Sequence, residues 1–213
     1  MLLFDLYDLI ENGENGSVEF KRKFSSHKKI AREIIAFANT KGGKIILGVD
    51  DNKSVIGVES EKAELELIND TAQFYCEPPI NYSSEIIHIY KKDVIIIEIP
   101  ESKTKPHCIV ENDKPALKKV YIRLKDKSVL ASNETIKILK KSNPDSPPMT
   151  INLGDKEKYL LNYLSYHDKI TLNTLKELLN LSGRRASRIL INLARAELIR
   201  HNSSEKEDFY TLI

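Results

Sequence analysis

The double glycine Gly42-Gly43 limits what the first 60 residues of the chain can fold into. The preceding residues, 27–39, carry apolar side chains at helical spacing, and the following run, 44–49, is almost wholly apolar. Glycine tolerates a positive φ and close backbone approach, so it ends helices and lets the chain turn directly into a strand. We therefore predict a helix from about His27 to Asn39 and a buried strand over Lys44–Val49.

The same glycines do not form a phosphate-binding loop. The pattern GxxxxGK[ST] is absent, and the glycines follow a helix instead of preceding one. ATP is therefore not expected as a cofactor. His107 has no serine or carboxylate at a recognisable triad spacing, and Cys76 and Cys108 lack a CxxC spacing. Neither a catalytic dyad, a zinc site nor a disulfide framework is expected, and free thiols indicate a reducing cytoplasm.

Helices and strands mix along the first 140 residues without regular βαβ alternation. This order predicts an α+β fold with a mixed sheet. Besides the elements above, we expect an initial helix that Gly13 ends, a short strand around Glu19, a strand at Val55–Val58, a helix from Glu61 to Tyr75, a hairpin of Ile86–Tyr90 and Val94–Ile99, a strand at Val120–Leu124, and a closing helix at Asn133–Lys141.

A proline-rich segment, Lys141–Pro148, is the clearest domain boundary. Its three prolines, together with Ser, Asn and Asp, continue neither a helix nor a central strand. We predict a first domain over residues 1–142, a linker over 143–152 and a second domain over 153–213.

The second domain has the element order of a winged helix-turn-helix. Apolar spacing predicts helices over Asp155–Tyr166, Leu172–Leu179 and Gly183–Glu197, a short strand at Ile170-Thr171, and a terminal hairpin formed by residues 199–204 and 208–212. Ser182 is placed to cap the third helix, which would bury Ile189 and Leu193.

The third helix carries a row of polar and basic side chains opposite its apolar face. Arginine suits both guanine edges and phosphates, so this row predicts contact with DNA. The alternative is a solvated face on a helix that packs or dimerises. Acidic residues at the hairpin tip, Glu205, Glu207 and Asp208, oppose DNA binding because they repel phosphate. The candidate DNA-contacting residues are Arg184, Arg185, Arg188, Asn192 and Arg195.

Carboxylates stand where several segments of the first domain begin or end. Glu14 and Glu19 precede and occupy the first strand, and Asp50 and Asp51 follow the next one. If these strands are neighbours, the acids can converge on Mg²⁺ or Mn²⁺, which prefer oxygen ligands. The alternative is a turn at Asp50-Asp51 and an ion pair between Glu19 and Lys21.

Basic residues surround these acids. The net charge of the chain is only +2, so nucleic-acid binding requires local basic patches. Tyr121 and Arg123 alternate onto one strand face, where a ring can stack beside a guanidinium. We predict Lys21, Lys23, Tyr121 and Arg123 as nucleic-acid-binding residues, with solvated surface charge as the alternative.

Four segments together resemble the Schlafen-type AlbA domain over residues 10–140. They are Val18–Lys21, Ala36–Gly43, Gly48–Asp51 with Val55-Ile56-Gly57, and Tyr121-Ile122-Arg123. The resemblance implies a nucleic-acid-binding domain. In bacteria and archaea such domains are often joined to a C-terminal winged helix in transcriptional regulators.

Animal Schlafen proteins use the same fold to cleave RNA with three acids. Carried over by motif, these are Glu14, Glu19 and Asp51, which the resemblance implies as catalytic and metal-binding residues of an endoribonuclease with Mg²⁺ or Mn²⁺. The animal enzymes use a tandem copy of the fold, whereas this chain has one, so a homo-oligomer is expected to supply the second half.

The combined expectation is a cytoplasmic DNA-binding transcriptional regulator that requires no cofactor. DNA is the expected partner, RNA is the alternative, and no membrane contact is expected because no apolar run is long enough to cross a bilayer. The competing predictions are the metal-dependent endoribonuclease acting on structured RNA and a protein-interaction or dimerisation module.

Overall fold

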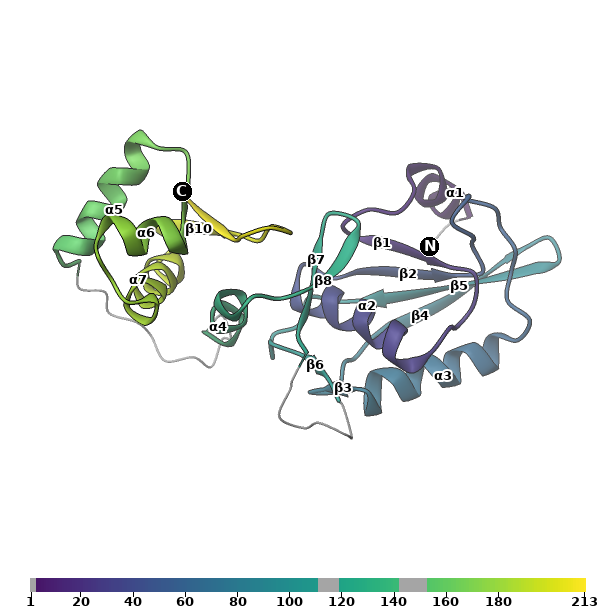
Figure 1. Ribbon diagram of the computed structural model, residues 1–213. Coiled ribbons are helices and arrows are strands. Elements are labelled where there is room, and N and C mark those ends of the chain that lie inside the picture. Colours follow the sequence, from purple (N-terminus) through teal and green to yellow (C-terminus); the bar gives the residue numbers. More distant parts are fainter. Residues whose placement is uncertain (1–2, 111–118, 142–152) are drawn as a thin grey trace. The chain divides into compact units, whose positions relative to one another are not determined.

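The computed structural model describes residues 3–110, 119–141 and 153–213 (Figure 1). The chain divides into two compact units, Met1–Leu130 and Ala131–Ile213. Each unit has an apolar core of its own. The predicted linker, residues 143–152, lies outside the described residues.

A four-stranded mixed sheet forms the centre of the first unit, in the order β1-β2-β5-β4. The first pair is parallel and the other two pairs are antiparallel. The predicted α+β fold with a mixed sheet is therefore confirmed. The strands are β1 (Val18–Lys21), β2 (Gly43–Leu47), β4 (Ser83–Ile89) and β5 (Lys92–Ile99).

Helices cover both faces of this sheet (Figure 1). On β2, Ile46 packs with Leu6 of the helix α1, whereas Ile45 and Leu47 pack with the helices α2 and α3. Successive side chains of a strand point to opposite faces, so burial on both sides explains the unbroken apolar run. The helices are α1 (Leu3–Asn12), α2 (His27–Asn39) and α3 (Glu61–Phe74).

Two small antiparallel pairs complete the first unit. They are β3 (Cys76–Glu77) with β6 (Cys108–Ile109), and β7 (Tyr121–Leu124) with β8 (Lys127–Leu130). The strand predicted at Val55–Val58 is instead a loop held by two isolated bridges, Val49↔Val55 and Val58↔Asp93. Gly48 and Gly57 both have positive φ there, which breaks the extended pairing.

The double glycine ends α2 as predicted. Gly42 has a φ of 76°, and its N–H donates to Phe37 O at 3.0 Å. A Cβ on Gly42 would lie 2.7 Å from Ile99 O, and one on Gly43 would lie 2.3 Å from the Phe37 ring. Only glycine permits this close approach of α2, β2 and β5.

The second unit combines four helices and a three-stranded sheet of order β10-β11-β9 among its described residues. Leu160, Leu190 and Tyr210 lie in its core. The predicted helices and terminal hairpin are present. The elements are α4 (Asn133–Lys141), α5 (Asp155–Tyr166), β9 (Ile170–Thr171), α6 (Leu172–Leu178), α7 (Gly183–Arg195), β10 (Ile199–Asn202) and β11 (Phe209–Leu212).

The helix α4 belongs to the second unit and not, as predicted, to the end of the first. Ile138 packs against the core of the second unit, and Lys137 Nζ donates to Ser187 Oγ of α7 at 3.1 Å. The proline-rich segment after α4 suggested a boundary there, but the packing of α4 moves the boundary to residue 130. Within the described ranges, no helix is long and apolar enough to cross a membrane.

Candidate functional site

The motif segments of the first unit converge on the guanidinium of Arg123. Its Nη1 lies 3.0 Å from Glu19 Oε2 of β1 and 3.1 Å from Glu33 Oε2 of α2. Its Nη2 donates to Asn15 O at 2.8 Å, and its guanidinium lies 4.7 Å from the centre of the Phe37 ring. One buried cation therefore joins β7, β1 and α2.

This geometry corrects the expectation that Arg123 binds phosphate. The residue is only 6% exposed, and two carboxylates already neutralise its charge. Lys21 is engaged as well, because its Nζ lies 2.5 Å from Glu19 Oε1 and donates to Phe20 O. Tyr121 lies on the same strand face as Arg123, but this face packs on α2 and the core, so the ring is no exposed stacking platform.

Two polar residues at the end of α2 hold the neighbouring segments in place. Asn39 is buried; its Nδ2 donates to both His107 O and Tyr121 O at 2.9 Å, and its Oδ1 accepts from His107 N at 2.8 Å. Thr40 Oγ1 accepts from Arg123 N at 2.9 Å. The side chains of Asn39 and Thr40 thus provide hydrogen-bond partners for backbone N–H and C=O groups outside the regular strand ladders.

A pocket of about 320 Å³ lies between the residues that follow β1 and the loop before α3. Another of about 300 Å³ lies beside Arg123. Exposed Lys23 lines the first pocket, as predicted for a surface cation. Exposed Lys41 and Lys125 line the second, together with Gly16 and Ser17. Lys41 and Lys125 were not among the predicted residues, although Lys41 directly precedes the double glycine.

The acids Glu14, Glu19 and Asp51 share one neighbourhood. Partial burial raises the pKa of Glu14, a hydrogen bond from Phe20 N opposes this, and the charges of Glu19 and Asp51 raise the pKa further. Asp50 takes the turn role, since its Oδ1 accepts from Asp51 N, and it pairs with Arg22 at 3.4 Å.

These acids do not fit a three-carboxylate metal site as the side chains lie. Carboxylate oxygens suit Mg²⁺ or Mn²⁺, but Glu19 is already neutralised by Lys21 and Arg123. Within the described part of the chain, the potential metal ligands that gather within 4.8 Å belong to Glu61, His88 and Asp93 instead.

In the second unit, α7 presents a basic face. Ser182 caps the helix, accepting from Arg185 N at 3.4 Å. Arg184, Arg185 and Arg188 are exposed and form no ion pair with any residue that the structure describes. Asn192 and Arg195, further along, are half-buried.

The acidic hairpin tip should repel phosphate less than its sequence implied, because Asp208 and Glu207 are paired with other side chains. Asp208 turns inward, where it accepts from Ser132 Oγ and lies 3.0 Å from His201 Nε2. Burial alone would raise the pKa of Asp208, but these hydrogen bonds outweigh it and lower the pKa to about 2. Glu207 accepts from Asn173 Nδ2 at 2.8 Å.

One polar contact escaped the sequence analysis. His107 Nε2 lies 2.6 Å from Ser102 Oγ, and His107 Nδ1 lies 2.7 Å from Pro78 O, beside a pocket of about 360 Å³. Burial lowers the pKa of His107, so the neutral ring bridges these two loops. The five-residue spacing of Ser102 and His107 is no known triad spacing, so the contact between them is visible only in the folded structure.

The family model Schlafen, AlbA_2 matches residues 14–132 of the chain. An uncharacterized ATP-binding protein, UU034, of Ureaplasma parvum serovar 3 is 30% identical over 128 residues, which cover 49% of this chain and 36% of that relative. The chain therefore spans about a third of the length of this curated relative.

Two solved structures show distant likeness. The DIP2311 protein of Corynebacterium diphtheriae is 14% identical with a TM-score of 0.49, covering 92% of this chain and 36% of that one. The N-terminal domain of a RecG-related protein of Nitrosomonas europaea is 20% identical with a TM-score of 0.44, covering 61% and 94%. Both TM-scores lie below 0.5, so neither likeness assigns a fold or a function.

Proposed function

The chain belongs to the Schlafen AlbA_2 family, and from that premise we propose that it is a nucleic-acid-binding protein, specifically a DNA-binding transcriptional regulator. In this proposal the second unit is a winged helix that reads DNA, and the first unit adds contacts to phosphate.

The observation that carries the proposal is the face of α7. Arg184, Arg185 and Arg188 lie on the first turns of the helix, and Arg184 and Arg188 are turned away from the buried Ile189 and Leu193. The N-terminal residues of a recognition helix are those that meet base edges in helix-turn-helix proteins. Because none of the three arginines pairs with a described residue, their charge is available to a polyanion.

The shape of α7 favours double-stranded DNA over double-stranded RNA. The major groove of B-DNA is about 12 Å wide and admits a helix, whereas the deep, narrow major groove of A-form RNA does not. An arginine face on a helix is therefore matched to DNA.

In the first unit, the predicted Lys23 is kept as a phosphate contact, and Lys41 and Lys125 replace the predicted Lys21 and Arg123. All three are exposed and line pockets. Lysine at such a surface acts as a point charge toward phosphate, so these contacts position the nucleic acid without reading its sequence.

The salt dependence of binding to random duplex DNA tests the proposal. Each neutralised phosphate contributes about −0.9 to the slope of log K against log salt, so the three arginines of α7 and the three lysines of the first unit together give about −5.4. The double substitution Arg184→Ala with Arg188→Ala should reduce the magnitude of the slope by about 2. Lys158→Ala, an exposed cation on α5, is the control and should change it little. A flat salt dependence of the wild type contradicts DNA binding.

Selection from a random DNA pool distinguishes residues that contact bases from residues that contact phosphates. Arg188→Ala should relax sequence preference, whereas Lys23→Ala should weaken binding uniformly. A protein that retains no nucleic acid at low salt would instead favour the protein-interaction module, with α7 as its docking face.

RNA cleavage stays a second prediction, which rests on the shared neighbourhood of Glu14, Glu19 and Asp51 and requires Glu19 to release Lys21 or Arg123 before a metal can bind. Structured RNA incubated with Mg²⁺ or Mn²⁺ tests it. Asp51→Asn is the informative variant because Asp51 is exposed and the change should leave the fold intact. Glu11→Gln, an exposed acid on α1, is the matched control. Cleavage that Asp51→Asn does not affect would refute the assigned acids.

The proposal gives ATP no role, although the relative from Ureaplasma parvum carries ATP-binding in its name. Gly42 and Gly43 follow α2 instead of preceding a helix, and the sequence has no GxxxxGK[ST] pattern for a phosphate-binding loop. A homodimer is part of the proposal, since two recognition helices read two half-sites of DNA. Light scattering measures the oligomeric state, and a monomer on DNA would overturn this part.

A further inference from the structure

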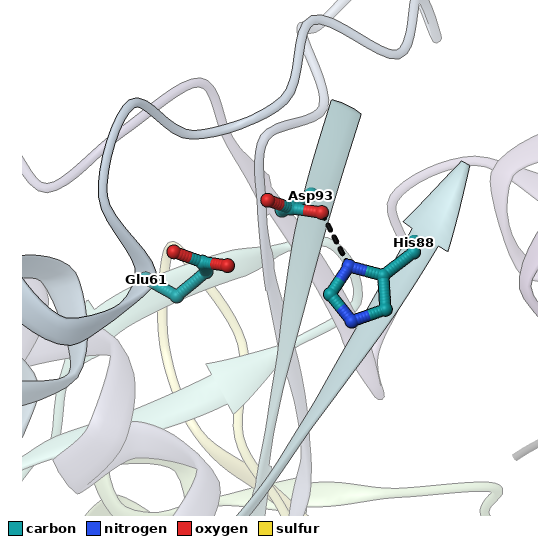
Figure 2. Close-up of side chains that lie close together, drawn as sticks. All are labelled: Glu61, His88 and Asp93. Atoms are coloured by element: carbon teal, nitrogen blue, oxygen red, sulfur yellow. Dashed lines mark hydrogen bonds and ion pairs between the residues drawn. The ribbon is translucent and has the colours of Figure 1, made fainter. Parts of the chain in front are cut away.

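Three potential metal ligands meet at one end of the first unit, away from Arg123. Glu61 starts α3, His88 lies near the end of β4, and Asp93 lies near the start of β5. One ligand atom from each lies within 4.8 Å of the others. Figure 2 shows the three side chains facing one another, with His88 Nδ1 2.5 Å from Asp93 Oδ1.

Backbone contacts fix the positions of all three residues. His88 and Asp93 are direct cross-strand partners in the β4–β5 ladder. Val58 N donates to Asp93 O at 2.8 Å, which fastens the loop before α3 to the hairpin. Ser60 caps α3 by accepting from Ala63 N, so Glu61 takes the first helical position.

A glycine makes this fastening possible. Gly57 has a φ of 82°, and a Cβ there would lie 2.8 Å from Lys92 Cβ. The loop therefore approaches the hairpin more closely than any other residue type at position 57 would allow. The site is thus assembled by main chain from three elements instead of by flexible side chains alone.

The trio combines two carboxylates with one imidazole. Two carboxylates held within 4.8 Å of each other repel, and the imidazole of His88 pairs with Asp93 (Figure 2). Lys92, the adjacent cation on β5, is directed elsewhere, because its Nζ donates to Val55 O at 2.6 Å.

We propose that Glu61, His88 and Asp93 bind one divalent transition-metal ion of the Zn²⁺ class. One imidazole nitrogen and two carboxylate oxygens form a mixed donor set that suits Zn²⁺ better than Mg²⁺ or Ca²⁺, which prefer oxygen alone.

The present spacing needs only small adjustments to hold such an ion. Zinc–ligand distances of about 2.0–2.2 Å place neighbouring donor atoms roughly 3.3 Å apart in a tetrahedron. The carboxylates must therefore close in, and the hydrogen bond between His88 and Asp93 must open to admit the metal. Three protein ligands leave a fourth position for water or for a ligand from another molecule.

The bound ion would tie the start of α3 to the β4–β5 hairpin. It should therefore raise the melting temperature of the protein further as the Zn²⁺ concentration rises, because it binds the folded state only. This site does not depend on the proposed DNA binding, so either can fail without the other.

Isothermal titration of the full, tag-free chain with Zn²⁺ tests the proposal. We expect one site per chain, at least a tenfold loss of affinity in His88→Ala and in Glu61→Gln, and no change in Glu66→Gln, an exposed acid on the same helix. Co²⁺ should give the visible absorption of a low-coordinate site, which His88→Ala abolishes. Mg²⁺ in hundredfold excess should leave Zn²⁺ bound.

Absence of Zn²⁺ binding overturns the proposal, and so does binding that His88→Ala and Glu61→Gln leave unchanged. Displacement by Mg²⁺ would overturn the assigned metal class. The three side chains are half-buried or exposed, so circular dichroism should show that each variant keeps the wild-type fold.

Discussion

Replacing Arg123 with methionine should destabilise the first unit strongly. Methionine keeps much of the side-chain volume but removes the charge between Glu19 and Glu33. These side chains are only 10% and 2% exposed. Breaking a buried ion pair by removing one partner costs about 3–5 kcal/mol, because the other charge stays buried without compensation.

The ion pairs that Glu19 and Glu33 keep in the variant decide where in this range the loss of stability falls. Glu19 keeps Lys21 at 2.5 Å, and Glu33 keeps Arg32 at 2.8 Å. Since neither carboxylate loses every cation, we expect the lower end, about 3 kcal/mol. Arg32→Met is the matched control: Arg32 contacts the same Glu33, but its side chain is 46% exposed, so its loss should cost about 0–1 kcal/mol.

Hydrogen exchange of backbone amides in β2 and α2 is the assay. The chain has no tryptophan and has tyrosines in both units, so bulk fluorescence would mix the two unfolding events, whereas amide exchange reports each unit. Adding Glu33→Gln to Arg123→Met removes one uncompensated charge. The double variant should therefore be more stable than the sum of the single losses predicts.

Two results would refute this reasoning. One is an Arg123→Met variant within about 1 kcal/mol of the wild type, which would mean that water reaches the carboxylates. The other is strict additivity of Arg123→Met and Glu33→Gln, which would mean that the residues do not interact energetically.

Three further perturbations test other parts of the fold. The lowered pKa of Asp208, about 2, contributes stability above pH 4 that is lost as pH falls toward 2. Asp208→Asn should therefore cost about 2 kcal/mol at pH 7 and flatten acid unfolding of the second unit; an unchanged acid profile would exclude this role. Gly42→Ala should lower the free energy of unfolding by at least about 2 kcal/mol, because the φ of Gly42 is positive and a Cβ there would meet Ile99 O. Gly183→Ala should leave the free energy of unfolding unchanged, and chemical denaturation measures both. Burial and the charge of Cys108 raise the pKa of Cys76 to about 12, so a thiol reagent at pH 8 should label Cys76 only at the rate of unfolding; immediate labelling would contradict its burial.

Local signals in the sequence were sufficient for much of the architecture. The helix of residues 27–39, its end at Gly42, the β4–β5 hairpin and the arginine face of α7 all depend on residues within about two turns of one another. Periodicity and glycine conformation act over that range. The sequence motifs also identified the family, but they did not show that Lys21 and Arg123 are paired with Glu19.

The tertiary structure decided which charges meet. Arg123 reaches Glu19 and Glu33 across 104 and 90 residues of chain, and no local pattern distinguishes such a buried cation from a solvated one. The same holds for α4, whose amphipathic face fits either unit until its partner is known. His88 and Asp93 meet within the hairpin, whereas Glu61 is brought to them by the loop that a bridge at Val58 fastens to the hairpin. Electrostatic interactions act through space and depend on burial, so their partners follow from the packing of the chain.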